Sequence, residues 1–264
     1  RYVRTKAFSK EQKTGKISFR GIGGLPYSSW WRNFRAGLKK NPANTCVLPW
    51  GDKLLATYEG GWPYALDPNT LETLGSEDFG GKLDRGSNFL AHTRWDDERK
   101  ELIGISLLPG KNTSFTIHVY AEDGSCRMKR KYVLEGAAMV HDFLITPSYV
   151  VVLENPLKVD VKGLLRSMVG LKAMMHCLDQ ADRPSRILLF PREPLPQEEW
   201  AGQVKTIPMD ESCMSFHHAW AHETDGENGR ELEMVSCIIG AYGNFGSEFG
   251  YLGRETPFKE EPDE

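Results

Sequence analysis

The chain has 264 residues, the size of one large domain or two small ones. Its 33 Lys and Arg against 36 Asp and Glu leave a formal net charge of −3, too balanced for a protein that binds nucleic acid or a membrane through a basic surface. With 40% hydrophobic residues it can bury a large core, and its 26 Gly and 15 Pro are more than a helical bundle can place. The composition therefore favours a β-rich globular protein without a nucleic-acid partner.

The cysteines and the apolar runs bear on the redox compartment of the protein and on whether it spans a membrane. The five cysteines are an odd number without a Cys-x-x-Cys pair, which favours reduced thiols in a reducing compartment over a disulfide framework or a zinc ribbon. No apolar run approaches the ~18 residues that cross a bilayer. The chain opens on Arg1 with no targeting segment, so we expect a processed protein or a piece of a longer gene product.

In chain order, the polar residues Lys6–Gly24 predict a loop, and a hairpin follows. Val47–Leu48 and Lys53–Glu59 have strand composition, and glycine can supply a positive φ at the turn Trp50-Gly51-Asp52 between them. The later strand candidates are Tyr64–Leu66, Phe89–Trp95, Glu101–Leu107, Phe115–Ala121, Lys129–Leu134, Met139–Thr146, Tyr149–Leu153, Arg186–Phe190, Gln203–Ile207, Ser212–Glu223 and Glu231–Ile239. Short strands at turn spacings of roughly 8–12 residues predict an all-β sandwich, barrel or propeller.

One segment departs from the strand pattern. Asp160 is a candidate N-cap, and the apolar residues that follow recur with a period of about 3.6, so Val161–Cys177 is predicted as a helix inserted in the β fold. This helix either covers the core or presents an apolar surface to a membrane or an apolar substrate. Residues 240–264, rich in glycine and charge, predict a segment that is loosely ordered in isolation.

Three of the seven histidines, His92, His141 and His217, interrupt strand-like apolar runs. A buried imidazole needs partners for both ring nitrogens, and a metal with a carboxylate behind the ring supplies them. A histidine hydrogen-bonded in the core, or exposed at a strand end, is the simpler interpretation of the spacing alone. Because neighbouring strand residues point to opposite faces, only one of His217 and His218 can join a common site.

Six segments carry a more specific signal. They are Asn-Thr-Cys-Val-Leu-Pro-Trp-Gly at 44–51, Leu-Leu-Ala-Thr-Tyr-Glu-Gly-Gly-Trp-Pro-Tyr-Ala-Leu-Asp-Pro at 54–68, Leu-Ala-His at 90–92, Ala-Ala-Met-Val-His-Asp-Phe-Leu-Ile-Thr at 137–146, Arg-Ile-Leu-Leu-Phe-Pro-Arg at 186–192 and Phe-His-His-Ala at 216–219. In this order, and over nearly all of the chain, they resemble the carotenoid cleavage oxygenases.

The resemblance implies a seven-bladed β-propeller, incomplete here, with a non-haem Fe(II) on its axis held by four histidines. His92, His141 and His217 match three of the ligands, and their separations, 141 − 92 = 49 and 217 − 141 = 76, suit blades of at least ~40 residues. Glu59 matches a carboxylate of the catalytic site that hydrogen-bonds a ligand imidazole. The implied reaction is oxidative cleavage, by dioxygen, of a carbon–carbon double bond in a carotenoid or apocarotenoid.

The implied substrate is a neutral polyene, which a tunnel would select by its shape and aromatic walls. The aromatic residues near the motifs are candidates for such walls, although core packing is the simpler role for any one of them. They are Trp50, Trp62, Phe89, Trp95, Phe143 and Trp220. The resemblance also implies a plastid or cytoplasmic protein, with peripheral membrane contact through the predicted helix.

The chain departs from the family pattern in three places. Thr93 and Trp220 stand where relatives commonly have Pro and Asn, and no histidine follows His222, although the family's fourth ligand lies near the C-terminus. We therefore expect a single propeller domain over 1–264, truncated at both ends, that aggregates and binds iron poorly when expressed alone. Two alternatives stay open: a retinoid or carotenoid isomerase with the same iron site, and a non-catalytic propeller that binds a pigment or a partner.

Overall fold

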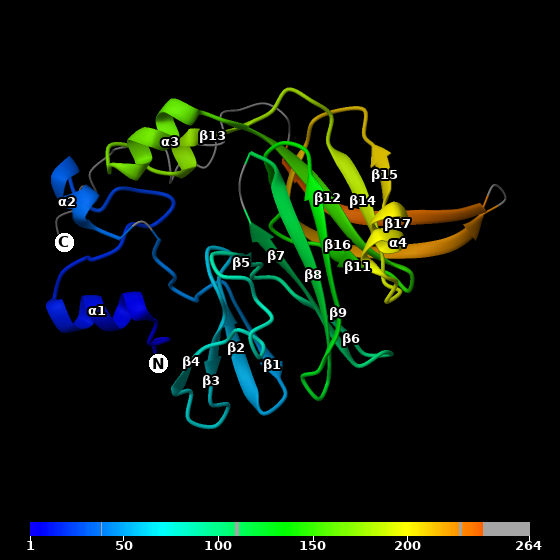
Figure 1. Ribbon diagram of the computed structural model, residues 1–264, viewed down its shortest axis with the longest axis horizontal. Coiled ribbons are helices and arrows are strands. Elements are labelled where there is room, and N and C mark those ends of the chain that lie inside the picture. Colours follow the sequence, from blue (N-terminus) through cyan, green and yellow to red (C-terminus); the bar gives the residue numbers. More distant parts are fainter. Residues whose placement is uncertain (38, 109–110, 227–228, 240–264) are drawn as a thin grey trace, which may run out of the picture.

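Four antiparallel sheets follow one another along the chain in the computed structural model, which describes residues 1–37, 39–108, 111–226 and 229–239 (Figure 1). The first sheet has the strand order β1-β2-β3-β4, and the second has the order β5-β7-β8-β9, with β6 also paired to β7. The third has the order β10-β12-β14-β15, with β11 and β13 also paired to β12, and the last is the hairpin β16-β17. This succession of antiparallel sheets confirms the predicted all-β, propeller-type fold.

The strand and helix bounds agree with most of the sequence predictions, including the first hairpin, in which Gly51 takes a φ of 56°. The strands are β1 (Cys46–Trp50), β2 (Lys53–Thr57), β3 (Tyr64–Leu66), β4 (Thr73–Ser76), β5 (Asn88–Phe89), β6 (Arg94–Asp96), β7 (Glu101–Leu108), β8 (Thr113–Ala121), β9 (Cys126–Leu134), β10 (Ala138–Met139), β11 (Leu144–Ile145), β12 (Tyr149–Val159), β13 (Leu178–Gln180), β14 (Arg186–Pro191), β15 (Lys205–Pro208), β16 (Met214–Gly226) and β17 (Gly229–Ile239). The helices are α1 (Lys6–Thr14), α2 (Trp30–Arg35), α3 (Val161–Met168), α4 (Gln197–Gly202) and the 3-10 turn η1 (Met175–Cys177).

Each sheet packs on its neighbours through an apolar core. Trp50 of the first sheet meets Phe89 and Tyr120 of the second in one buried cluster. The second and third sheets share the largest cluster, which β7, β8, β12, β14 and the fully buried Trp200 of α4 build together. Burying one such side chain stabilises the fold by roughly 1.5–3 kcal/mol. The cores between sheets therefore fix the position of each sheet relative to the next.

In three sheets one strand has more residues than the partner strand that it faces. These strands, here called the inner strands, are β5–β6, β10–β11 and β16. Two predicted strands, Phe89–Trp95 and Met139–Thr146, are wrong as continuous strands, because each is split into two short pieces on the same partner strand. Residues 90–93 face only 104–105 of β7, residues 140–143 face only 152–154 of β12, and residues 216–217 face only 237 of β17. Each inner strand thus has one or two residues more than its partner, which is the pattern of a β-bulge.

Two predictions about helices are wrong in part. The segment predicted as a loop contains α1, which begins after the N-cap Thr5, whose side chain accepts a hydrogen bond from the Phe8 amide. The predicted helix Val161–Cys177 begins at its predicted N-cap, Asp160, but α3 ends at Met168. It ends there because Gly170 takes a φ of 82° and packs against α2, where a Cβ would lie 2.6 Å from the Phe34 amide nitrogen. The predicted loose segment 240–264 lies outside the described residues.

His118 of β8 is fully buried within the second sheet. Its Nε2 lies 2.8 Å from the Ser106 hydroxyl, and its Nδ1 lies 3.3 Å from the Tyr120 hydroxyl. Burial, helped by the charge of Lys129 and opposed by that of Asp84, lowers the pKa of His118 to about 4. The folded protein therefore holds this imidazole neutral at pH values where an exposed histidine is protonated.

We expect this histidine to make the fold acid-sensitive. Its folded pKa is lower than the unfolded value of 6.5, so its contribution to stability is present above pH 6.5 and is lost as the pH falls towards 4. By pH 5 the loss amounts to about 2 kcal/mol. Chemical denaturation at pH 7.5 and 5.0 should show this loss in the parent and in a His222→Gln control, and a flatter dependence in His118→Gln. Parallel profiles for the parent and His118→Gln would contradict the prediction.

Candidate metal centre

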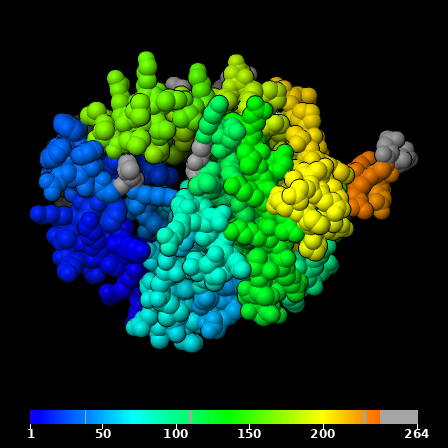
Figure 2. Space-filling view, in the orientation of Figure 1, coloured from blue at the N-terminus to red at the C-terminus, as the bar shows by residue number. Residues whose placement is uncertain are grey.

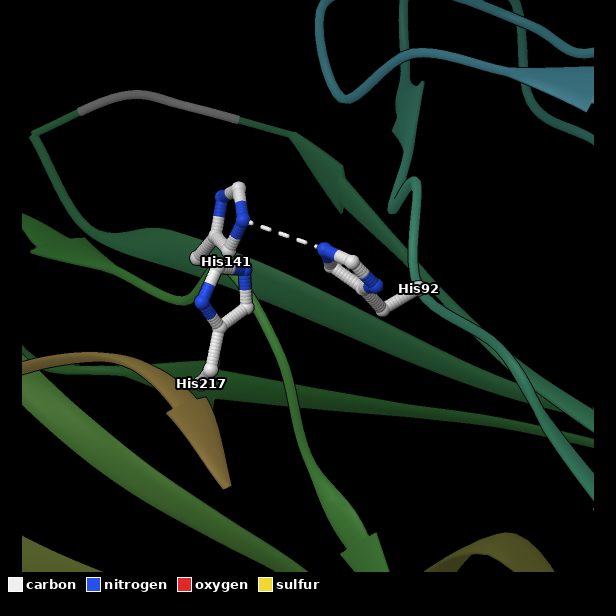
Figure 3. Close-up of side chains that lie close together, drawn as sticks. All are labelled: His92, His141 and His217. Carbon is white, nitrogen blue, oxygen red and sulfur yellow. Dashed lines mark hydrogen bonds between the residues drawn. The ribbon is translucent and has the colours of Figure 1, made fainter. Parts of the chain in front are cut away.

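Three histidines from three different sheets converge on one point (Figure 3). His92 lies between β5 and β6, His141 lies between β10 and β11, and His217 lies in the bulge of β16. One ring nitrogen of each lies within 4.8 Å of the other two. The extra residues of the inner strands therefore coincide with the three histidines predicted from the sequence, as expected where a bulge re-aims a side chain.

The rings are arranged as ligands of one ion would be. Their centroids lie 4.9–5.1 Å apart and their planes cross at 60–86°, so the rings do not stack on one another. Nε2 of His92 lies 3.2 Å from Nε2 of His141. Two imidazole nitrogens held about 2.0–2.1 Å from one ion, at tetrahedral or octahedral angles, lie about 2.9–3.4 Å apart. This separation between His92 and His141 fits a shared metal ion, and the neutral nitrogen donors fit a first-row transition metal.

Glu59, which follows β2 in the first sheet, contacts the His141 ring of this cluster. Its carboxylate oxygen Oε2 pairs with Nδ1 of His141, a buried atom that has no aligned hydrogen-bond partner within the described ranges. The His141 side chain is only 11% exposed. A carboxylate at Nδ1 holds the proton there and leaves the Nε2 lone pair free for an ion. The predicted carboxylate is therefore in place to orient the ring.

Burial keeps the His92 ring neutral. Loss of solvent lowers the pKa of His92, and positive charge on His141, His217 or Arg94 would lower it further, against the opposing effect of Asp142. A neutral imidazole is the form that binds a metal. His218, on the opposite side of its strand, is buried and has Nδ1 2.8 Å from the Ser236 hydroxyl, so only His217 of this pair joins the cluster.

Three further residues brace the cluster and were not among the sequence candidates. Thr57 Oγ1 donates to the carbonyl of Ala91, next to His92, at 2.7 Å. Arg94 and Asp142, each within two residues of a cluster histidine, form an ion pair. Thr57 and Asp142 lie inside the motif segments, but which residues they contact depends on the pairing of distant strands.

The predicted aromatic walls do not line one common surface. Trp50 and Phe89 belong to the core between the first two sheets, and Phe143 is fully buried. Trp95 and Trp220 are 40% and 46% exposed. These positions, with the partly buried Trp62 packed on the first core, support core packing as the role of the buried members.

Comparison with known proteins confirms the family resemblance. The sequence model of the Retinal pigment epithelial membrane protein family matches residues 1–259. The apocarotenoid-15,15'-oxygenase of Synechocystis is 34% identical over 235 residues, covering 86% of this chain and 46% of that protein. The chloroplastic carotenoid cleavage dioxygenase 7 of rice is 28% identical over 95% of this chain and 49% of that protein, and resveratrol cleavage oxygenase 1 of Chaetomium globosum is 33% identical over 63% and 28%.

Solved structures agree with the sequence relatives. A variant of the Synechocystis apocarotenoid oxygenase has a TM-score of 0.75 at 31% identity, covering 86% of this chain and 47% of that one. The cobalt-substituted Synechocystis enzyme has a TM-score of 0.75 at 29% identity, covering 93% and 51%. The chain thus spans about half the length of the relatives that it matches.

We expect Glu59→Gln to weaken metal binding. Glutamine keeps the size of the side chain but removes the charge that holds the Nδ1 proton of His141, and loss of such an outer partner typically costs 10–100-fold in metal affinity. Competition with a chromogenic chelator, with Co(II) as the probe, measures the effect. Glu77→Gln is the matched control, since Glu77 is a partly buried carboxylate paired with Lys53. Equal affinity for the Glu59 variant and the parent would contradict this role.

Proposed function

Because the chain belongs to the Retinal pigment epithelial membrane protein family, we propose that it carries the iron site of a dioxygenase that cleaves a carotenoid or apocarotenoid. The observation that carries the proposal is the convergence of His92, His141 and His217 at three strand bulges, with Glu59 behind the His141 ring. A relative named for oxidation of apocarotenoids is 34% identical over 86% of the chain. The arrangement of the histidines and the similarity to a known oxygenase therefore support the same function.

The proposed cofactor is Fe(II). Neutral imidazoles suit this ion and add no negative charge to it. When bound, iron supplies open coordination positions and the redox chemistry that dioxygen requires. The three histidines would hold it, and Glu59 would keep the His141 ring in the tautomer that leaves Nε2 free. The family's fourth ligand has no counterpart after His222 in this sequence.

The proposed reaction balances without a further reductant. One alkene and one dioxygen give two carbonyl products: the carbon–carbon double bond and the oxygen–oxygen bond break, and two carbon–oxygen double bonds form. Each product carries one oxygen atom from the same dioxygen molecule. A neutral polyene offers few polar groups, so shape and apolar contact would decide which double bond is cleaved.

The test is product analysis under labelled dioxygen. The protein that contains this chain, purified at the full length of its gene product and loaded with Fe(II), is incubated with an apocarotenal under ¹⁸O₂, and we expect two aldehyde products that each carry label. His141→Ala should abolish both metal binding and product, because it removes a ligand and the partner of Glu59 together. Iron removal by a chelator should have the same effect, and re-addition should restore activity.

Other outcomes separate the alternatives. A geometric isomer without label would support an isomerase and contradict cleavage. Binding of the polyene without any product, in a chain that holds iron, would support a non-catalytic pigment-binding propeller. Cleavage of resveratrol in place of the polyene would overturn the proposed substrate class and point to the stilbene-cleaving relatives.

We also propose that the protein docks on a membrane, which is where a polyene substrate dissolves. Arg20 of the N-terminal region donates to the carbonyls of Ser167 and Met168 at the end of α3, and Asn33 of α2 donates to the carbonyl of Gly170. The two helices therefore form one surface, visible at the upper left of Figure 2. Its apolar side chains are 47–65% exposed and are Trp30, Trp31, Phe34, Val161, Leu165, Met168 and Leu171.

This apolar surface suits peripheral attachment. No helix within the described residues is long and apolar enough to span a membrane. An amphipathic helix with aromatic and aliphatic residues on one side, and lysine or arginine nearby, partitions into the interface of a bilayer. Lys162 and Arg166 supply that charge. The proposed location is accordingly a carotenoid-bearing membrane surface in a plastid or facing the cytoplasm.

Co-sedimentation with liposomes measures this attachment. We expect the parent to bind vesicles that contain anionic lipid and Leu165→Glu to lose most of that binding, because a carboxylate cannot enter the apolar part of the interface. Leu74→Glu is the matched control, since Leu74 is 63% exposed on β4, in the first sheet. Equal loss in both variants would contradict a role for the α2–α3 surface.

A further inference from the structure

We propose that Asp142 and Arg94 form a positioning pair that sets the spacing of the three cluster histidines. The pair is not a metal ligand in this inference, which rests on the proposed metal site. Asp142 follows His141 directly, and Arg94 lies two residues after His92. The backbone amide of His218, next to His217, also donates to the Asp142 carboxylate. One ion pair thus reaches the chain beside every histidine of the cluster.

The Asp142 carboxylate collects donors from three sheets. Arg94 Nη2 lies 2.7 Å from both Asp142 oxygens. The backbone amide of His218 donates to Oδ2 at 3.2 Å, and that of Phe143 donates to Oδ1 at 2.8 Å. Arg94 in turn donates through Nε to the carbonyl of Phe143 at 2.8 Å. The pair therefore joins the inner strands of the second, third and fourth sheets at one point.

The surroundings make this point rigid. The Asp142 side chain is 3% exposed, so its charge is stable only while donors surround it. Its oxygens accept from one guanidinium and two backbone amides, and hydrogen bonds to a charged group are stronger than those between neutral groups. A change in the position of one inner strand would break one of these bonds inside the protein. The carboxylate therefore resists relative movement of the three strands.

The bulges explain why such a brace is needed. Extra residues interrupt the regular ladder beside each histidine, so backbone pairing alone leaves these short segments poorly fixed. Leu90, Val140 and Phe143 of these segments enter the apolar core, but apolar contacts are non-directional and do not by themselves orient a neighbouring side chain. Asp142 supplies directional contacts to two of the three bulges directly and to the third through Arg94. The spacing of the histidines depends on this pair.

The test is Co(II) binding by the full chain and by Asp142→Asn. Asparagine keeps the shape of the side chain but loses the charge that holds Arg94. We expect a 10–100-fold loss of Co(II) affinity in a chelator competition, with a shift of the visible cobalt absorption bands that report ligand geometry. Glu154→Gln is the matched control: Glu154 is a fully buried carboxylate paired with Arg186 of the neighbouring strand β14 and with Arg183 in the loop before that strand. It should bind Co(II) within about twofold of the parent.

A second variant covers the case in which Asp142→Asn does not fold. Arg94→Lys keeps the positive charge but cannot bridge the carboxylate and the Phe143 carbonyl with one planar group, so we expect weaker Co(II) binding and shifted bands here too. The double variant that combines Asp142→Asn with Arg94→Lys should lose no more Co(II) affinity than Asp142→Asn alone, because both substitutions break the same pair.

The outcomes distinguish the two proposals. Parent-like affinity and parent-like bands in a folded Asp142→Asn or Arg94→Lys variant would overturn the positioning role and leave the proposed function standing. Loss of affinity in Glu154→Gln equal to that in the positioning variants would overturn it as well, because any buried ion pair would then have the same effect. A full-length parent protein that binds neither Co(II) nor Fe(II) would overturn the proposed metal site itself.

Discussion

The register of three inner strands is the constraint on which this site depends. A strand presents alternate residues to opposite faces, so an inserted residue interrupts the ladder and turns the local side chains. Here the insertions occur at His92, His141 and His217, and each sits on the strand of its sheet that faces the other histidines. The interrupted ladders cost hydrogen bonds, which is why the neighbouring backbone is braced by side chains. The candidate metal centre exists because three separate sheets share the same irregularity.

Several polar contacts between sheets lie at this inner edge, and apolar clusters fill the space between the sheets. Thr57 links the first sheet to the chain beside His92, and Glu59 links it to His141. The Asn155 side chain exchanges two hydrogen bonds with the Ser215 backbone, which joins the third sheet to β16. Each bond contributes only about 1 kcal/mol net, but leaving one of these buried groups unpaired costs more. Apolar burial therefore supplies most of the stability, and these bonds decide the orientation of the histidines.

Much of this fold could be predicted from the sequence, because the signals involved are local. The strands from Glu101 to Leu134 have regular apolar patterns and clear turns, and Asp160 is a readable N-cap. The break within Phe89–Trp95 could not be seen, since an apolar run has the same pattern whether its partner strand matches it residue for residue or not. The early end of α3 coincides with Gly170, whose left-handed φ stops the helix and whose backbone packs against α2, more than a hundred residues away in sequence. The histidines were identified from motifs, whereas their convergence required the pairing of distant strands.

The Arg94–Asp142 pair also explains how a buried carboxylate can lie beside a candidate cation site without dominating its electrostatics. Asp142 raises the pKa of His92, and Arg94 lowers it, so the two charges act on the ring in opposite directions. An unpaired aspartate at this position would favour a protonated imidazole, which cannot bind a metal. An unpaired arginine would repel the ion directly. Burial keeps the His92 ring neutral, and Arg94 opposes the effect of Asp142 on that ring, so the carboxylate can link three strands without its charge acting on His92 unopposed.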